Sequence, residues 1–105
     1  MNWEGRYSGV LPCADCRGVE TTVEIRRDSS FHLKQVELSH DNKIKGEVYE
    51  TTGNFRWEQG ATVVSFKGRD SVMNFKVGHL FLMPLDRQGN ELEEVRGNNF
   101  RLLKE

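Results

Sequence analysis

Apolar and polar residues alternate along most of this 105-residue chain, the pattern of β-strands that bury one face. In the clearest run, Val19, Thr21, Val23 and Ile25 share one parity, and the residues between them are polar or charged. The same two-residue spacing predicts further strands around Phe31 and Leu33; Phe55 and Trp57; Val64 and Phe66; Met73, Phe75 and Val77; and Phe100 and Leu102.

Turn-forming residues separate these runs at intervals of roughly 8 to 12 residues, a spacing typical of meandering β-folds. Gly, Asn or Asp occurs in each predicted turn, where the backbone needs positive φ or a local hydrogen bond. Val36 and Leu38 fall on the opposite parity from Phe31 and Leu33, which predicts a bulge near Lys34 and Gln35. The predicted turns lie at residues 27–29, 40–43, 59–60, 67–70, 77–78 and 86–90.

A sheet of about eight to nine strands with one apolar face has to close or fold back on itself. Closure also removes the exposed edges that promote aggregation. We therefore expect residues 1–105 to form one all-β domain, a small antiparallel up-and-down barrel, with a two-sheet sandwich as the alternative. A barrel of this size has room for packed side chains or for one small ligand.

Charge and hydropathy exclude two classes of function. Fifteen Lys and Arg residues against sixteen Asp and Glu residues give a net charge of −1, without the basic stripe that a nucleic-acid groove requires. The longest apolar run is Leu80-Phe81-Leu82-Met83, far below the roughly 20 residues of a membrane-spanning helix. No catalytic constellation is visible either, because Asp15 has no histidine near it in the sequence.

The motif Leu11-Pro12-Cys13-Ala14-Asp15-Cys16-Arg17-Gly18 carries the most distinctive chemistry of the chain. A redox-active cysteine pair usually begins a helix, whose dipole lowers a thiol pKa, but Gly18 is followed by strand-like alternation. A structural zinc site needs four ligands at matched spacing, and the three histidines lie scattered in separate segments. Both interpretations are therefore disfavoured.

Two interpretations of the cysteine pair remain open. In an oxidising compartment, Cys13 and Cys16 are expected to form a local disulfide that pins a turn between two strands. When reduced, the two thiolates suit Cu(I), a soft ion of low coordination number. Pro12 suits the exit from a strand, and the Asp15 carboxylate is expected to bond amides of its own turn.

The segment around the cysteines resembles the N-terminal domain of the NlpE family of outer-membrane lipoproteins. The resemblance rests on Tyr7-x-Gly9-x-Leu11-Pro12-Cys13-Ala14-Asp15-Cys16-x-Gly18-Val19-x-Thr21. Two later segments agree more weakly, Gly53-Asn54-Phe55-Arg56-Trp57 and Leu85-Asp86-Arg87-Gln88-Gly89-Asn90. The resemblance therefore spans nearly the whole chain.

This resemblance implies a lipocalin-like β-barrel in an exported protein that faces the periplasm or the cell surface. Its lipid anchor would be a cysteine upstream of residue 1, so we expect a mature domain without its signal peptide and lipobox. Larger family members carry a second, C-terminal OB-type domain, which we do not expect here. The family is linked to copper tolerance and to envelope-stress signalling through the Cpx sensor kinase.

Three hypotheses for function follow. The first is a non-enzymatic envelope lipoprotein domain that acts by protein contact, with a Cpx-type kinase as the partner implied by resemblance and no cofactor. The second is Cu(I) binding by Cys13 and Cys16. The third is a barrel that binds a small apolar ligand. Its candidate lining residues are Tyr7, Trp57, Phe66 and Phe75, which equally suit a packed core.

Overall fold

The computed structural model describes residues 3–12, 16–39, 45–69, 71–86, 88–91 and 100–105, and they form an all-β fold of nine strands. Every pair of hydrogen-bonded neighbours is antiparallel. Within these residues, no helix has the length and hydropathy needed to cross a membrane. The strands are β1 (Gly5–Leu11), β2 (Gly18–Ile25), β3 (Ser30–Leu38), β4 (Lys45–Asn54), β5 (Arg56–Glu58), β6 (Val63–Lys67), β7 (Val72–Gly78), β8 (Phe81–Leu85) and β9 (Leu102–Lys104).

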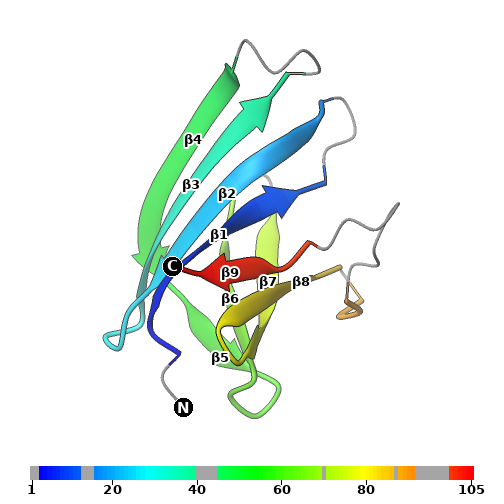
Figure 1. Cartoon of the computed structure of the whole chain (residues 1–105). Helices are drawn as coiled ribbons and strands as arrows, with labels where there is room; N and C mark the ends of the chain where they lie inside the picture. The colour runs from blue at the N-terminus through cyan, green and yellow to red at the C-terminus, as the bar shows by residue number, and fades with distance from the viewer. Residues whose placement is uncertain (1–2, 13–15, 40–44, 70, 87, 92–99) are drawn as a thin grey trace.

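The strands form a single curled sheet in the order β4-β3-β2-β1-β9-β8-β7-β6-β5 (Figure 1). Read as a circle, this order is an up-and-down meander, because β9 pairs with β1 and the chain itself joins β4 to β5. The join is at Phe55, whose N–H donates a hydrogen bond to the Ser29 carbonyl oxygen (2.8 Å). The predicted antiparallel barrel is confirmed in the form of a half-barrel, and the two-sheet sandwich is not formed.

The concave face of the sheet holds the core. The predicted parity is confirmed in β2, where Thr21, Val23 and Ile25 are buried. Aromatic rings fill the middle of the curl: Phe66 stacks on Phe31 (ring centroids 4.3 Å apart) and on Phe75 (5.8 Å). The other fully buried apolar side chains are Tyr7, Leu33, Val64, Leu82 and Leu102.

The two ends of the curled sheet differ. We call the end with the β2–β3, β5–β6 and β7–β8 turns the closed end, and the opposite one, with the β1–β2, β3–β4 and β6–β7 connections, the open end (Figure 1). At the closed end, the rings of Trp3, Phe55 and Trp57 meet edge to face, with centroids 5.1 to 5.8 Å apart. Such aromatic pairs add to the stabilisation from burial.

The bulge predicted near Lys34 and Gln35 is wrong. Both residues pair regularly with β4, and the register irregularity lies further along, between Val36 and Leu38. The β2–β3 register is unbroken through the same region. Because strand residues alternate between faces, Val36 and Leu38 lie on the convex face. The change of parity in the sequence therefore reflects apolar residues on that face and not a bulge at Lys34 and Gln35.

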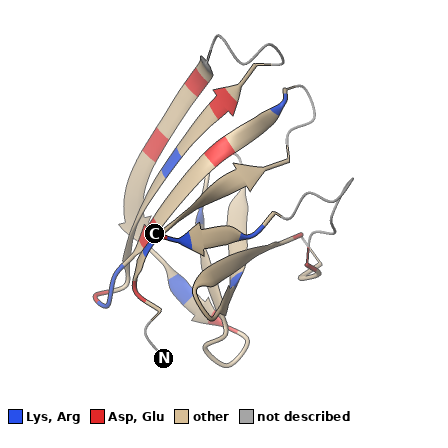
Figure 2. Ribbon diagram, in the orientation of Figure 1, with Lys and Arg blue, Asp and Glu red and all other residues tan. Residues whose placement is uncertain are grey.

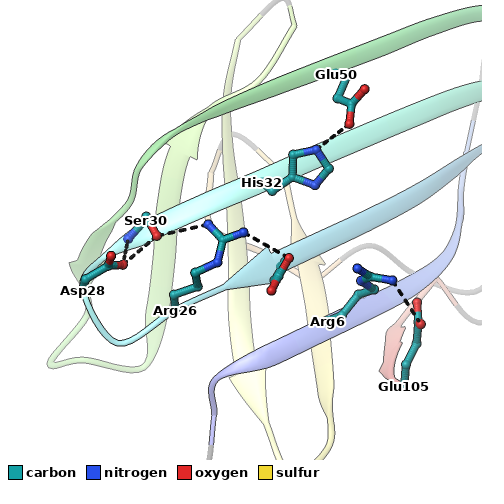
Figure 3. Close-up of polar contacts among 8 residues, drawn as sticks. Arg6, Arg26, Asp28, Ser30, His32, Glu50 and Glu105 are labelled. Atoms are coloured by element: carbon teal, nitrogen blue, oxygen red, sulfur yellow. Dashed lines mark hydrogen bonds and ion pairs between the residues drawn. The ribbon is translucent and has the colours of Figure 1, made fainter.

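Lys, Arg, Asp and Glu residues are spread over the strands and the turns (Figure 2). Several form pairs between neighbouring strands (Figure 3): His32 Nε2 lies 2.5 Å from Glu50 Oε2, and Arg6 Nη1 lies 4.0 Å from Glu105 Oε1. Within β2 and its turn, Arg26 lies 3.2 Å from the Glu24 carboxylate. Exposed pairs of this kind contribute about 0–1 kcal/mol each to stability.

Candidate functional site at the cysteine loop

The cysteine motif joins β1 to β2 at the open end of the sheet. The two strands pair without interruption from Gly5 opposite Ile25 to Leu11 opposite Val19. The connection is therefore anchored at its base by a regular ladder. Its last residue before β2 is held from the other side as well, because the Arg17 N–H donates a hydrogen bond to the Leu38 carbonyl oxygen of β3 (3.1 Å).

Three residues of the segment from Tyr7 to Thr21 form part of the concave face next to this loop. Leu11 and Tyr7 are buried in the core, and the Tyr7 hydroxyl donates a hydrogen bond to the Trp3 carbonyl oxygen (2.5 Å). Burial raises the pKa of Tyr7 above its ordinary value. Thr21 is fully buried, and its hydroxyl donates to the Val19 carbonyl oxygen (3.0 Å). The burial of these side chains in the core anchors the β1–β2 hairpin.

Two glycines of the segment from Tyr7 to Thr21 occupy positions without room for a side chain. A Cβ at Gly9 would lie 2.8 Å from the Arg101 carbonyl oxygen and 3.1 Å from Leu102 Cδ2. A Cβ at Gly18 would lie 2.5 Å from Val10 Cγ1. Gly9 therefore lets the chain entering β9 approach β1, and Gly18 lets β2 begin directly against β1.

The cysteines are only partly described. Cys16 is half-buried, is not a free thiol, and its Sγ lies 3.2 Å from the Gly18 carbonyl oxygen. Cys13 and Asp15 lie outside the described residues, so the predicted Cys13–Cys16 disulfide and the role of Asp15 stay predictions. Pro12 is exposed at the end of β1, where a strand exit was predicted. Among the described residues, no group of three or more His, Cys, Asp or Glu could hold a metal ion.

The four candidate lining residues all belong to the packed core or its margin. Tyr7, Phe66 and Phe75 are buried, and Trp57 is half-buried in the aromatic cluster at the closed end. Phe75 also lines a hollow of about 520 Å³ at the open end, together with Leu11, Met73 and Pro84. Apolar ligand binding by these residues stays a prediction.

A polar cluster at the open end was not predicted from the sequence. Arg69, in the β6–β7 turn, forms an ion pair with Glu47 of β4, and its Nη1 lies 3.8 Å from Glu37 Oε1 of β3. Glu37 lies on the concave face, since it shares its parity with Phe31 and Leu33. Glu47 lines the same hollow as Glu37 and Tyr49, and Tyr49 packs against the core. Inward-facing charges at the ends of two neighbouring strands were the signal that could have revealed this cluster.

Comparison with known proteins matches residues 7–94 to the family described as the NlpE N-terminal domain. The Escherichia coli K12 protein named lipoprotein NlpE is 30% identical over 90 residues, which cover 83% of this chain and 36% of that protein. This chain therefore spans about a third of the curated relative that it matches.

Two solved structures have the same fold. One is a crystal structure of a Shewanella oneidensis protein described as a lipoprotein, with a TM-score of 0.82 and 32% identity, covering 99% of this chain and 90% of that one. The other is the Escherichia coli Cpx pathway activator NlpE, with a TM-score of 0.72 and 22% identity, covering 92% of this chain and 48% of that one. At 22% identity, the second match shows a shared fold and nothing more.

Proposed function

Because the chain belongs to the family of NlpE N-terminal domains, we propose that it is a non-enzymatic domain of a cell-envelope lipoprotein that acts by protein contact in an envelope-stress response. The names of its relatives support both parts of the proposal. One relative is called a lipoprotein, and a protein of the same fold is called an activator of the Cpx pathway.

Protein contact is favoured over ligand binding inside the fold because packed side chains fill the concave face. The stack of Phe31, Phe66 and Phe75 occupies the middle of the curl, and Tyr7 and Leu102 are fully buried beside it. A small barrel holds either packed side chains or a ligand in its interior. Recognition by this chain is then a property of its loops and outer surface.

The proposal places the domain at the outer membrane, anchored by a lipidated cysteine upstream of residue 1, and facing the periplasm or the cell surface. Its partner in signalling is a Cpx-type sensor kinase. The role includes copper tolerance by way of the same stress response, with protein contact as the mechanism.

The test is a Cpx-controlled reporter in cells that express this chain behind a lipoprotein signal and anchor. We expect induction of the reporter above the level given by an anchored, unrelated β-barrel domain expressed to the same amount. The double variant Cys13→Ser/Cys16→Ser, checked for folding, is expected to keep the induction, because contact needs no thiol chemistry. An anchored, well-expressed chain that leaves the reporter at its baseline contradicts the proposal.

A further inference from the structure

β4 lies at one margin of the curled sheet, where its outer edge is free. Within the described residues it pairs with β3 alone (Figure 1). The ladder is regular from Ser30 opposite Asn54 to Val36 opposite Val48, and the register shifts only beyond Val36. Residues 48–54 of β4 therefore present a regular, unpaired strand edge.

The backbone of this stretch is ready to pair with another strand. The Phe55 N–H donates to the Ser29 carbonyl oxygen (2.8 Å), so the odd-numbered residues at this end of β4 turn their backbone groups toward β3. Because the direction alternates along an antiparallel strand, the N–H groups of Val48, Glu50 and Thr52 point away from β3. A row of such groups is a template for a further strand.

The neighbouring segments leave this edge accessible. The ion pair of Arg69 with Glu47 is at the start of β4, before the regular stretch. Beside the other end of the stretch, a hollow of about 250 Å³ is lined by Asn54 and by Lys67 of β6. A second strand therefore finds room along residues 48–54.

The stretch also lacks the features that usually protect a free edge. Proteins block such edges with proline, lysine, a bulge or a very short strand. Residues 48–54 contain no proline and no lysine, and the register shift lies outside them. Val48 is 60% exposed, and Glu50 and Thr52 are exposed as well.

We infer that this edge pairs with the same edge of a second copy of the chain, antiparallel and about a two-fold axis at Thr51. Because residue 51 is the centre of the regular stretch, pairing about it uses the whole stretch of both copies. The residues whose N–H groups point away from β3 then face one another, as a hydrogen-bonded ladder requires. The opposed pairs are Val48 with Asn54, Glu50 with Thr52, Tyr49 with Gly53, and Thr51 with its own counterpart.

The second copy is the favoured occupant because the side chains of the stretch complement themselves in this register. Tyr49 is half-buried on the concave face, and Gly53, on the same face, is exposed without a side chain. An aromatic ring opposite a glycine covers the exposed backbone, and each copy supplies both partners. Glu50 lies opposite the uncharged Thr52, whereas an axis at Glu50 would set two carboxylates directly opposite, which is destabilising.

Such an interface is isologous, since the same surface serves on both copies. It is independent of the proposed signalling contact, because it concerns self-association of the chain. The reporter and the measurements below therefore succeed or fail separately.

Sedimentation equilibrium from micromolar to millimolar concentration, with reductant present, tests self-association, and we expect a monomer–dimer equilibrium. Thr52→Glu sets a carboxylate opposite Glu50 of the other copy at two symmetric places and should weaken dimerisation about tenfold. Thr52→Lys, opposite the same carboxylate, should keep or strengthen it. Leu103→Glu, at an exposed position of β9, adds the same charge elsewhere and should leave dimerisation unchanged.

The register has a test of its own. The double variant Thr52→Glu/Glu50→Lys restores opposite charges at both symmetric pairs, so it should recover the dimerisation that Thr52→Glu loses. At millimolar concentration, amide exchange at residues 48, 50 and 52 should be slower in the wild type than in Thr52→Glu. The amides of Thr51 and Gly53, which face β3 in either state, are the internal control.

A backbone variant keeps the test decisive if Thr52→Glu does not fold. Thr52→Pro removes one outward N–H and leaves the odd-numbered bonds to β3 in place, as proline on an edge strand can. With a native circular dichroism spectrum, it should be monomeric at concentrations where the wild type is a dimer.

Four outcomes would overturn the inference: a wild-type chain that stays monomeric at millimolar concentration, equal dimerisation by Thr52→Glu and Thr52→Lys, amide protection that lies outside residues 48–54, or a dimer that reductant abolishes. The last would show that an intermolecular disulfide, and not the edge of β4, joins the two copies.

Discussion

The Tyr7 hydroxyl and the Trp3 carbonyl oxygen lie 2.5 Å apart. A buried residue of β1 therefore binds the segment that precedes this strand. Trp3 in turn packs on Phe55 and Trp57 at the closed end. This bond connects the start of the described chain to the core and to the aromatic cluster.

Tyr7→Phe removes this hydrogen bond and keeps the ring. We expect the free energy of unfolding to fall by about 1–2 kcal/mol, the usual effect of removing a hydrogen bond to a buried group. Urea denaturation followed by tryptophan fluorescence measures the change. Thr22→Val, on the convex side of β2, is the control and should change stability by less than about 0.5 kcal/mol.

The same residue predicts a dependence on alkaline pH. Burial raises the pKa of Tyr7 in the folded chain above its ordinary value of 10.0. Above that ordinary value the unfolded chain loses the proton first, so this part of the stability is present below pH 10 and is lost as the pH rises toward the folded pKa. The stability of Tyr7→Phe should fall less steeply between pH 9 and 11 than that of the wild type, and parallel curves would contradict the assignment.

The Asp28 carboxylate in the β2–β3 turn accepts two hydrogen bonds from Ser30, one from the hydroxyl (2.6 Å) and one from the N–H (2.9 Å) (Figure 3). These bonds lower the pKa of Asp28 below its ordinary value of 3.8. The stability from this turn is therefore present above that value and is lost as the pH falls through the lower, folded pKa. Ser30→Ala should raise the pKa of Asp28 in an NMR titration, whereas Ser29→Ala should leave it unchanged.

Gly9 sits where β1 meets the chain entering β9, and Gly9→Ala tests that approach. The added Cβ would lie 2.8 Å from the Arg101 carbonyl oxygen, which is backbone and cannot turn aside. We expect a loss of about 1–3 kcal/mol in the free energy of unfolding, as for other overpacked sites. Ser8→Ala, the neighbour that points to the other face, should stay within about 0.5 kcal/mol of the wild type.

The strand pattern was the part of the fold most open to prediction from the sequence, because alternation reports directly which face is buried. Val23, Ile25, Phe31 and Leu33 occupy the concave face as their parity indicated. The same reasoning failed at Val36, where an apolar residue on the convex face was taken for a bulge. Parity alone cannot distinguish a shift in register from apolar residues on the outer face.

The candidate site was less predictable, since its geometry depends on pairings between distant segments. The motif glycines were visible in the sequence, but the backbone that crowds Gly9 belongs to Arg101 at the other end of the chain. The described β1–β9 ladder ends at Ser8 and Leu103, which no local pattern indicates. Arg69 likewise reaches carboxylates that precede it by 22 or more residues.

Arg69 ties the β6–β7 turn to β3 and β4, and Arg69→Gln tests what that tie contributes. Its ion pairs are partly exposed, so the expected loss of global stability is less than about 1 kcal/mol. Hydrogen exchange should accelerate in the β6–β7 turn and at the start of β4, where a local tie is lost. Lys67→Gln, the exposed neighbour in β6, is the control and should leave exchange at β4 unchanged.

The oxidation state of the cysteines is the last prediction. We expect protein isolated from the cell envelope without reductant to contain no free thiol, because oxidising compartments favour a disulfide between nearby cysteines. Thiol titration in denaturant, before and after reduction, measures this, and two thiols should appear only after reduction. Two free thiols in the isolated protein would contradict the disulfide and return attention to Cu(I). In that case, stoichiometric Cu(I) uptake that is absent from Cys13→Ser/Cys16→Ser would identify the pair as a metal site, since thiolates are the ligands that Cu(I) prefers.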